Sequence, residues 1–263
     1  MIPEPLVGQY VPGHSPVHRL DPRTKIGLLV AYTVVLFLVE AWRAYALLGA
    51  AILAATWAAR LPAGHLLAGL RPMAWLAGIT LVLNLVAVPG DPLVHLGPLV
   101  ATRQGLELGL RLAVRLLLLV AAASLLTLTT SPIALTDGLE ALLRLLGRRV
   151  PAHELAMMMT IALRFIPTLA EEAERIMKAQ LARGARFHQG GPLQRLRALV
   201  PLLVPLFVSA FRRADDLALA MEARGYRGGE GRTRYRELRP GPADALAAAL
   251  AALLFGWILW WGR

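Results

Sequence analysis

Long apolar stretches dominate the pattern of hydrophobic and polar residues along this chain. The stretch Leu112–Thr130 contains one charged residue, Arg115, and Met73–Val88 contains none. A third stretch, Ala243–Trp261, carries only Asp244, near its start. A bilayer core about 30 Å thick is crossed by a helix of roughly 20 apolar residues. Three stretches of about this length therefore predict an integral membrane protein built mainly from α-helices.

The remaining apolar segments extend this prediction to about five transmembrane helices in a single all-α membrane domain, 1–263. The four N-terminal helices, which make up region 1–131, are expected at 24–39, 43–59, 73–88 and 105–130. The fifth, at 243–261, occupies the C-terminal region 242–263. Asp21 can cap the first helix, and Pro22 fits its first position.

Two connections between these helices have recognisable sequences. Residues 61–72 follow Arg60, contain His65 and Arg71, and are expected to form a short cytoplasmic segment. The stretch Pro89–Arg103 is rich in proline and glycine and is expected to be an external loop. The glycines 49, 64, 69 and 78 do not follow Gly-x-x-x-Gly spacing, so they predict no particular helix pairing.

The stretch 132–241 has helical periodicity but is not uniformly apolar. We expect a short amphipathic helix at 133–146 and two long kinked ones at 153–184 and 193–225. Pro167 lies inside the first long helix, and Pro201 and Pro205 lie inside the second, so each is expected to bend into two arms. The N-terminal arms are apolar enough to enter the membrane, whereas the C-terminal arms are amphipathic.

Charge places these long helices in the cytoplasm. The chain carries a net charge of +11, and half of its 28 basic residues lie between positions 171 and 240, flanked by membrane segments. Cytoplasmic segments of membrane proteins carry such an excess of lysine and arginine. This position favours anionic lipid or an acidic protein as partner, and no nucleic acid is expected. The N-terminus is expected in the cytoplasm and the C-terminus outside, in a multi-pass protein of the cell membrane.

Each amphipathic arm presents one apolar stripe and one charged face. Residues recur at three- and four-residue spacing along both stripes, including Leu169, Ala173, Ile176 and Met177 in the first arm and Leu217, Ala218 and Met221 in the second. On the charged face of the first arm, Glu171 and Arg175, and likewise Glu174 and Lys178, are spaced for i,i+4 ion pairs. An exposed apolar surface of this extent is typical of an interaction site.

Both arms end in the same five-residue pattern, Ala-Arg-Gly-x-Arg, 41 residues apart. The first copy is Ala182, Arg183, Gly184 and Arg186, and the second is Ala223, Arg224, Gly225 and Arg227. Locally the pattern predicts a helix C-terminus, with glycine as the left-handed cap and arginine favoured by the helix dipole. Two copies of so specific a pattern, each closing an amphipathic helix, are not expected by chance.

The repeated pattern suits insertion into a partner. Alanine and glycine keep the helix tip thin, and arginine supplies a rigid donor fork for carboxylates or carbonyl groups in a groove. Two tips predict two grooves, and hence a soluble partner with two similar subunits.

At this point the sequence resembles the T component of energy-coupling factor (ECF) importers, which are ABC-type transporters and include the Q-type subunits of cobalt and nickel systems. The resemblance rests on His18–Lys25, on Ala162–Pro167 continuing through Glu171 and Glu172 to Gly184, and on Met221–Gly225. It implies that the paired motifs insert into two cytosolic ATPase subunits, identical or different. It also implies that the crossed cytoplasmic helices hold a substrate-binding membrane protein, the S component, for vitamins or transition metals.

No catalytic, cofactor or metal site is expected in this chain itself. It lacks a GxxxxGK[ST] loop, so ATP would be bound by the partner ATPase subunits. His14 and His18 lie in a proline-rich segment whose nearest carboxylate is Asp21, which argues against a metal site. The arginines at 111 and 115 are expected to extend toward the membrane interface.

Two other classes of function remain open from the residues alone. The main alternative is a membrane-embedded enzyme acting on an anionic lipid, which would need buried carboxylates or histidines on facing helices. A stand-alone secondary carrier would need ionisable residues at the membrane midplane or inverted repeats.

Overall fold

The computed structural model describes residues 10–96, 99–145, 151–185, 187, 191–228 and 240–261, which are mostly helical. In chain order, the elements are α1 (Pro16–Arg19), α2 (Pro22–Leu38), α3 (Trp42–Ala58), α4 (Ala63–Ala87), β1 (Pro92–Leu96), β2 (Leu99–Thr102), α5 (Arg103–Thr129), α6 (Pro132–Leu145), α7 (Ala152–Ala182), α8 (Pro192–Ala223) and α9 (Pro242–Trp261). The chain divides into two compact units. We call 8–142 with 237–263 the membrane unit, and 1–7 with 143–236 the paired-helix unit.

The membrane unit contains three helices that are long and apolar enough to cross a bilayer. They comprise 24 residues of α4, the 27 residues of α5 and the 20 residues of α9. The helices α2 and α3 have 17 residues each, about 25 Å at 1.5 Å per residue, which is the lower limit for crossing. The all-α membrane fold is therefore confirmed, apart from one small hairpin. The count of five crossings stays a prediction.

One predicted connection was wrong, and another contains a hairpin. Residues 63–72 do not form a separate cytoplasmic segment, because α4 begins at Ala63 and continues through Pro72. A proline is tolerated inside a membrane helix when neighbouring groups compensate for its missing donor, and α4 packs closely against α5. The loop predicted at 89–103 contains the antiparallel hairpin β1–β2, in which His95 pairs with Val100. Leucine and valine in both segments favour strands, a signal that the proline and glycine content masked.

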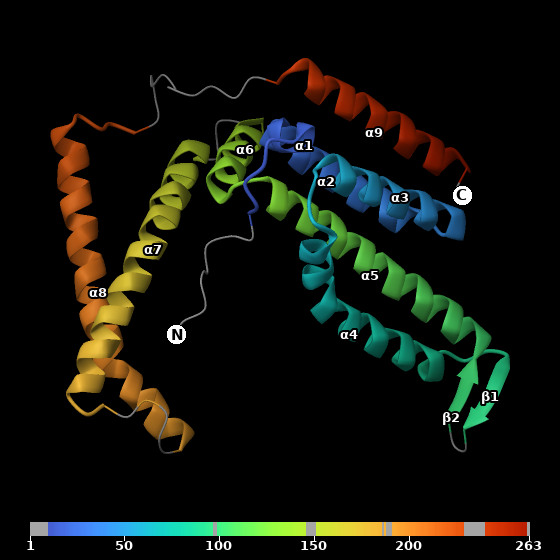
Figure 1. Ribbon diagram of the computed structural model, residues 1–263, viewed down its shortest axis with the longest axis horizontal. Coiled ribbons are helices and arrows are strands. Elements are labelled where there is room, and N and C mark those ends of the chain that lie inside the picture. The colour runs from blue at the N-terminus through green and yellow to red at the C-terminus, as the bar shows by residue number, and fades with distance from the viewer. Residues whose placement is uncertain are drawn as a thin grey trace. The chain divides into compact units, whose positions relative to one another are not determined.

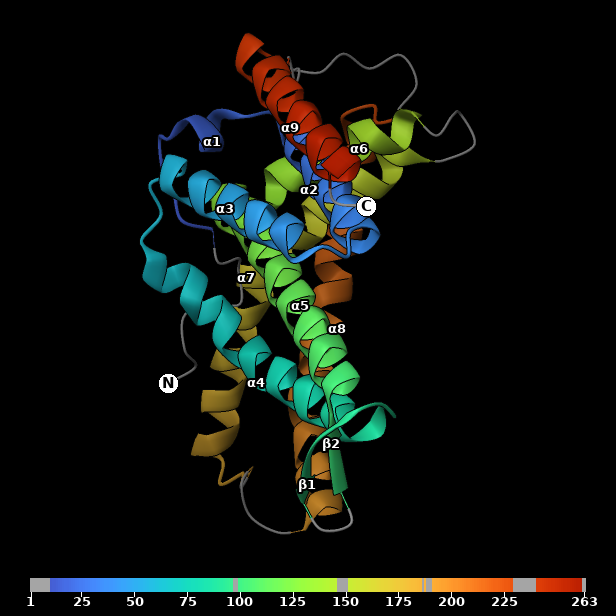
Figure 2. The ribbon, with the colours of Figure 1, turned by 90° about the vertical axis from the view of Figure 1, so that its right-hand side faces the viewer.

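Helices α4 and α5 run side by side, with the hairpin at one end (Figures 1 and 2). Glycines at positions 105 and 109 of α5 face α4 at this contact. A Cβ atom at Gly109 would lie 3.0 Å from the carbonyl oxygen of Leu81, and one at Gly105 would collide with the carbonyl oxygen of Asn84. Small residues spaced four apart let membrane helices approach closely. The prediction from glycine spacing did not include this pair, although the sequence contains it.

The core of the membrane unit lies where α2, α3, α5 and α9 meet. Leu36 of α2 and Leu48 of α3 are fully buried, and Ile258 of α9 is 1% exposed. At the end of α9, Trp257 stacks on Trp261, and the Arg43 guanidinium lies 5.1 Å from the ring of Trp261. Other large apolar side chains of these helices, among them Phe37, Leu53 and Leu253, are exposed, as expected where lipid takes the place of water.

The paired-helix unit is built from α7 and α8. Each remains a single helix through its internal prolines, with 31 and 32 residues. Figure 1 shows the first turns of α8 running at an angle to the rest, as expected from Pro201 and Pro205 in its first half. No comparable bend is visible in α7 (Figure 1), so the predicted division of that helix into two arms is not seen.

Candidate functional site

Helices α7 and α8 are antiparallel and contact each other near the middle of their amphipathic halves. Glu172 of α7 accepts a hydrogen bond from the guanidinium of Arg213 in α8, at 2.8 Å, and both side chains are partly exposed. These two residues are 41 positions apart, the same spacing that separates the two Ala-Arg-Gly copies. The two helices therefore meet at equivalent positions of an internal repeat.

The two motifs lie at opposite ends of this helix pair. Figure 1 shows the C-terminus of α7 at one end of the pair and the C-terminus of α8 at the other. Arg183 follows Glu172 by 11 residues, and Arg224 follows Arg213 by the same number, so each tip lies about 16 Å along its helix from the contact. The arrangement presents two similar tips pointing away from each other.

Both tips end in the same hydrogen-bonded turn. The amide of Gly184 donates to the Leu181 carbonyl at 2.9 Å, and the amide of Ala185 donates to the Gln180 carbonyl at 3.0 Å. At the second tip, Gly225 and Tyr226 make the matching bonds, at 2.8 and 3.0 Å. Gly184 and Gly225 have φ angles of 85° and 72°, in the left-handed region that glycine adopts without a Cβ penalty. The predicted glycine caps are therefore confirmed as local structure.

The arginines of the two tips are available to a partner. The side chains of Arg183 and Arg224 are exposed, and within the described part of the chain neither side chain makes a hydrogen bond or an ion pair. Arg227 is exposed as well, whereas Arg186 lies outside the described residues. An exposed, unpaired arginine beside a thin helix end can donate several hydrogen bonds to acceptors on another molecule.

The predicted apolar stripes are only partly exposed. Six members are half-buried, and one, Ala218, is exposed. The half-buried ones are Leu169, Ala173, Ile176, Met177, Leu217 and Met221. Two aromatic residues earlier in α8, Phe207 and Phe211, are more exposed than these half-buried members, at 59% and 69%. A partner that covers the stripes would therefore also meet these two rings.

One of the two predicted ion pairs on α7 is present. Lys178 lies 2.7 Å from the Glu174 carboxylate, and this hydrogen bond holds the pKa of Glu174 below its ordinary value. Glu171 and Arg175, the other predicted pair, make no bridge within the described residues. Exposed pairs of this kind contribute little to stability, because water screens the attraction.

The segment His18–Lys25 ties three parts of the membrane unit together. The Lys25 ammonium donates to the carbonyls of His18 and Thr129, at 3.3 and 3.0 Å, and to the Thr130 hydroxyl at 3.1 Å. Asp21 caps α2 by accepting from the Arg23 amide at 2.9 Å, as predicted. The Lys25 contacts join the start of α2 to the end of α5.

A second connection reaches α9 from the same segment. The backbone amide of Asp21 donates to the buried Asp244 carboxylate at 2.7 Å, and this carboxylate also accepts from the Gly241 amide. Both Lys25 and Asp244 are buried, with exposed fractions of 7% and 6%. From the sequence, only the helix cap and the family resemblance of this segment were predicted, and these long-range contacts were not foreseen.

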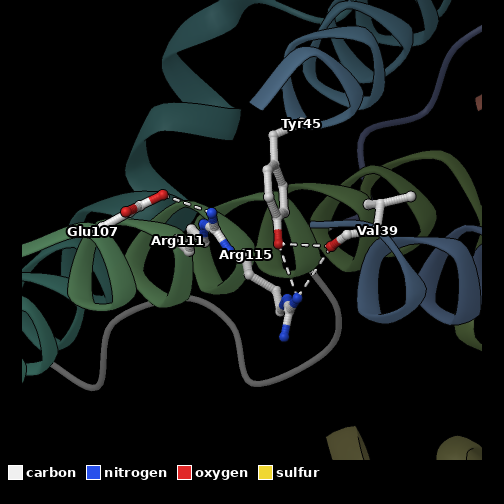
Figure 3. A network of polar contacts seen from close by, with 5 residues as sticks. All are labelled: Val39, Tyr45, Glu107, Arg111 and Arg115. Atoms are coloured by element: carbon white, nitrogen blue, oxygen red, sulfur yellow. Dashed lines mark hydrogen bonds and ion pairs between the residues drawn. The ribbon is translucent and has the colours of Figure 1, made fainter. Parts of the chain in front are cut away.

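A polar network also lies among the membrane helices (Figure 3). The Arg115 guanidinium donates to the Tyr45 hydroxyl at 2.8 Å and to the Val39 carbonyl at 3.3 Å. The Tyr45 hydroxyl in turn donates to the same carbonyl at 3.0 Å. The neighbouring Arg111 pairs with Glu107 on its own helix, at 2.6 Å. Arg115 thus fixes the α2–α3 connection to α5, a partner that the sequence did not indicate.

These features define an integral membrane protein that carries a separate pair of helices with exposed arginine tips. Among the described residues, no group of three or more histidine, aspartate or glutamate side chains is placed to hold a metal ion.

Comparison with known proteins agrees with this class. Residues 13–235 match the family described as cobalt transport protein (CbiQ). The chain is 54% identical to the energy-coupling factor transporter transmembrane protein EcfT of Thermosediminibacter oceani, over 94% of each chain. The EcfT protein of Acidaminococcus fermentans is 52% identical over 97% of this chain and 96% of its own, and that of Bacillus subtilis 47% identical over 97% and 98%.

The chain belongs to this family of transmembrane components of energy-coupling factor transporters. It is therefore a non-catalytic membrane subunit of a transport system. The resemblance noted from its motifs is confirmed, and the alternative of a lipid-modifying membrane enzyme is not favoured.

Proposed function

We propose that this chain couples two cytosolic ABC-type ATPase subunits to a substrate-binding S component, in an importer for vitamins or transition-metal ions. ATP binds to the ATPase subunits, and this chain transmits their motion. The observation that carries the proposal is the placement of Arg183 and Arg224 at opposite ends of one antiparallel helix pair, where both are exposed and have no partner among the described residues. The S component selects the substrate.

The spacing of the tips favours two separate docking grooves. Each tip lies about 16 Å from the Glu172–Arg213 contact, in opposite directions. One groove could not hold both tips, whereas two grooves on two similar subunits could hold one each. When the two subunits approach or separate, the tips are displaced with them, and the helix pair changes its crossing.

The test compares tip arginines with arginines elsewhere on the same helices. Arg183→Ala combined with Arg224→Ala should strip both ATPase subunits from the purified complex, because losing a buried, paired arginine at an interface costs about 2–5 kcal/mol. The matched control is Arg175→Ala with Arg212→Ala, which removes two exposed arginines away from the tips. The readout is the amount of each ATPase subunit that co-purifies. Full retention of both subunits by the tip variant would refute the proposal.

We further propose that the apolar stripes of α7 and α8 form the platform for the S component. The platform comprises Leu169, Ala173, Ile176, Met177, Leu217, Ala218 and Met221, and we add Phe207 and Phe211 because of their exposure. Two exposed aromatic rings on one helix face are typical of a surface that a partner covers. The substrate-bound and empty S components must contact this platform differently if ATP is to drive release.

The platform test separates partner contact from internal packing. Phe207→Glu with Phe211→Glu should abolish substrate uptake while both ATPase subunits remain bound. Leu169→Glu with Leu217→Glu should do the same, although these residues are half-buried. The control is Leu219→Glu, which places the same charge on an exposed apolar residue, on the face of α8 opposite to Leu217. Loss of the ATPase subunits in the Leu169 and Leu217 variant would show that the stripes serve helix packing instead.

The proposed topology has a cytoplasmic N-terminus, a cytoplasmic stretch 171–240 and an external C-terminus. The chain contains no cysteine, so single cysteines can be labelled without background. Cysteines at Lys178 and Trp260 should be labelled from opposite sides of the membrane. This labelling pattern is expected for three crossings as well as for five. A cysteine at Glu40, in the α2–α3 connection, distinguishes the two numbers of crossings. Labelling of position 40 from the outside indicates five crossings, and labelling from the cytoplasm refutes that count.

A further inference from the structure

A cavity of about 510 Å³ lies within the membrane unit, between α2, α3, α5 and α9. Figure 2 looks onto α3 and α9, two of the helices that line it. The lining is almost entirely alanine, leucine and other apolar side chains, and the polar lining residues are Lys25, Tyr32 and Thr129. An apolar cavity of about 150 Å³ already stays dry and takes up a small hydrocarbon such as benzene. This cavity is more than three times as large.

The cavity is elongated and reaches the surface of the unit. Along α2 the lining residues run from Lys25 to Tyr32, a distance of about 10 Å for seven residues of helix. At the Tyr32 end, its ring meets that of Phe255 edge to face, with centroids 6.2 Å apart. Leu250 of α9 lines the cavity and is 59% exposed, so the cavity is open to the surface of the unit beside this helix. The shape suits a hydrocarbon chain that enters from the side.

At the Lys25 end of the cavity, the exposed charged residues are basic. Two exposed charged residues lie within two positions of a lining residue: Arg19 precedes Leu20, and Arg60 follows shortly after Ala58. The acidic residues of this end, Asp21, Glu140 and Asp244, are buried. The Lys25 ammonium already donates to three oxygen atoms and has no need of a further partner. Val17 packs in one cluster with Ala59 and Leu61, so the segments that carry Arg19 and Arg60 lie beside each other near this end of the cavity.

We propose that this cavity binds one acyl chain of an acidic phospholipid, whose phosphate group is held by Arg19 and Arg60. Between membrane helices, the medium that can fill an apolar space is the hydrocarbon of the bilayer, because water would find no free polar partner there. Basic pockets between membrane helices bind acidic lipid headgroups in the same way. The lipid fills the gap between α3 and α9 and supports their packing. This role is independent of the ATPase and S-component contacts.

The cavity is tested by filling it. The full chain is purified in a mild detergent, and binding of phosphatidylglycerol is titrated by native mass spectrometry. Ala55→Phe places a ring in the lining of α3. Displacing about three methylene groups of the lipid chain corresponds to roughly a fiftyfold loss of affinity. The matched control is Leu53→Phe, on the same helix, at an exposed position that does not line the cavity. Ala55→Val, with a smaller side chain, gives a graded loss and covers the case in which Ala55→Phe does not fold.

The headgroup contact is tested by removing charge. Arg19→Gln with Arg60→Gln should weaken binding of phosphatidylglycerol about thirtyfold, since each basic residue near the membrane surface contributes about fivefold. Binding of phosphatidylcholine should change little. Arg103→Gln, an exposed arginine at the start of α5, is the control.

Three outcomes would overturn the proposal. If Ala55→Phe and Ala55→Val bind phosphatidylglycerol as the native chain does, the lipid lies only on the outer surface. If the native chain binds phosphatidylcholine equally well, the site has no preference for an acidic headgroup. If the Arg19 and Arg60 variant binds as the native chain does, these residues do not hold the phosphate.

Discussion

The polar network around Arg115 allows a quantitative prediction. Tyr45 is 3% exposed, and its hydroxyl both accepts from Arg115, at 2.8 Å, and donates to the Val39 carbonyl, at 3.0 Å. Tyr45→Phe removes both bonds and leaves Arg115 with the carbonyl alone. Arg115→Met keeps a long apolar side chain but removes its two hydrogen bonds and its stacking over Phe37. Both substitutions should lower the free energy of unfolding.

The magnitude follows from the kind of bond that is lost. A hydrogen bond from a charged donor contributes about 1.5–3 kcal/mol in proteins, whereas bonds between membrane helices average only about 0.6 kcal/mol and reach about 1.7. We therefore expect a coupling energy of about 1–2 kcal/mol between positions 45 and 115 in a double-mutant cycle. Each single substitution should destabilise by more than this, because each also removes a contact outside the pair.

The measurement is unfolding of the purified chain in mixed micelles of increasing denaturing detergent, for the native chain, both single variants and the double variant. Arg111→Met is the control, because its pair with Glu107 is partly exposed and on one helix, and its loss should cost under about 1 kcal/mol. A coupling energy within about 0.5 kcal/mol of zero would mean that positions 45 and 115 act independently, and the hydrogen bond between them would then contribute nothing to stability.

Three further predictions follow from the described contacts. Lys25→Met should destabilise the chain by at least about 2 kcal/mol, since it removes three hydrogen bonds at a buried site. Lys178→Met, the control, should have little effect. Equal shifts of the detergent unfolding curve for the two variants would contradict this prediction. Gly184→Ala, at a φ of 85°, should destabilise the end of α7 by about 1–2 kcal/mol and reduce the amount of ATPase subunits that co-purifies. An unchanged amount would show that ATPase binding does not depend on the cap geometry. Gly109→Leu should separate α4 from α5 and lower thermal stability, whereas Gly78→Leu, with open space around it, should not.

The sequence alone determined the features that depend on neighbouring residues or on averaged hydrophobicity. Long apolar stretches define a membrane protein whatever the packing, because a polar backbone in lipid must form helices or closed sheets. Asp21 and Pro22 fix the start of α2 through a bond that spans two residues. Gly184 and Gly225 end α7 and α8 through turns that involve only their own helix ends. The repeated Ala-Arg-Gly pattern could therefore be recognised from the order of residues alone.

The tertiary structure decided what depends on residues far apart in the chain. The partner of Arg115 is Tyr45, 70 positions away, and Lys25 finds Thr129 104 positions away. Neither pairing has a local signal, because it arises only when α2, α3 and α5 pack in one particular register. The start of α4 at Ala63 could not be inferred locally either, since its packing against α5 compensates for an internal proline. The contact of Glu172 with Arg213, and with it the opposite direction of the two tips, likewise follows from how α7 and α8 cross.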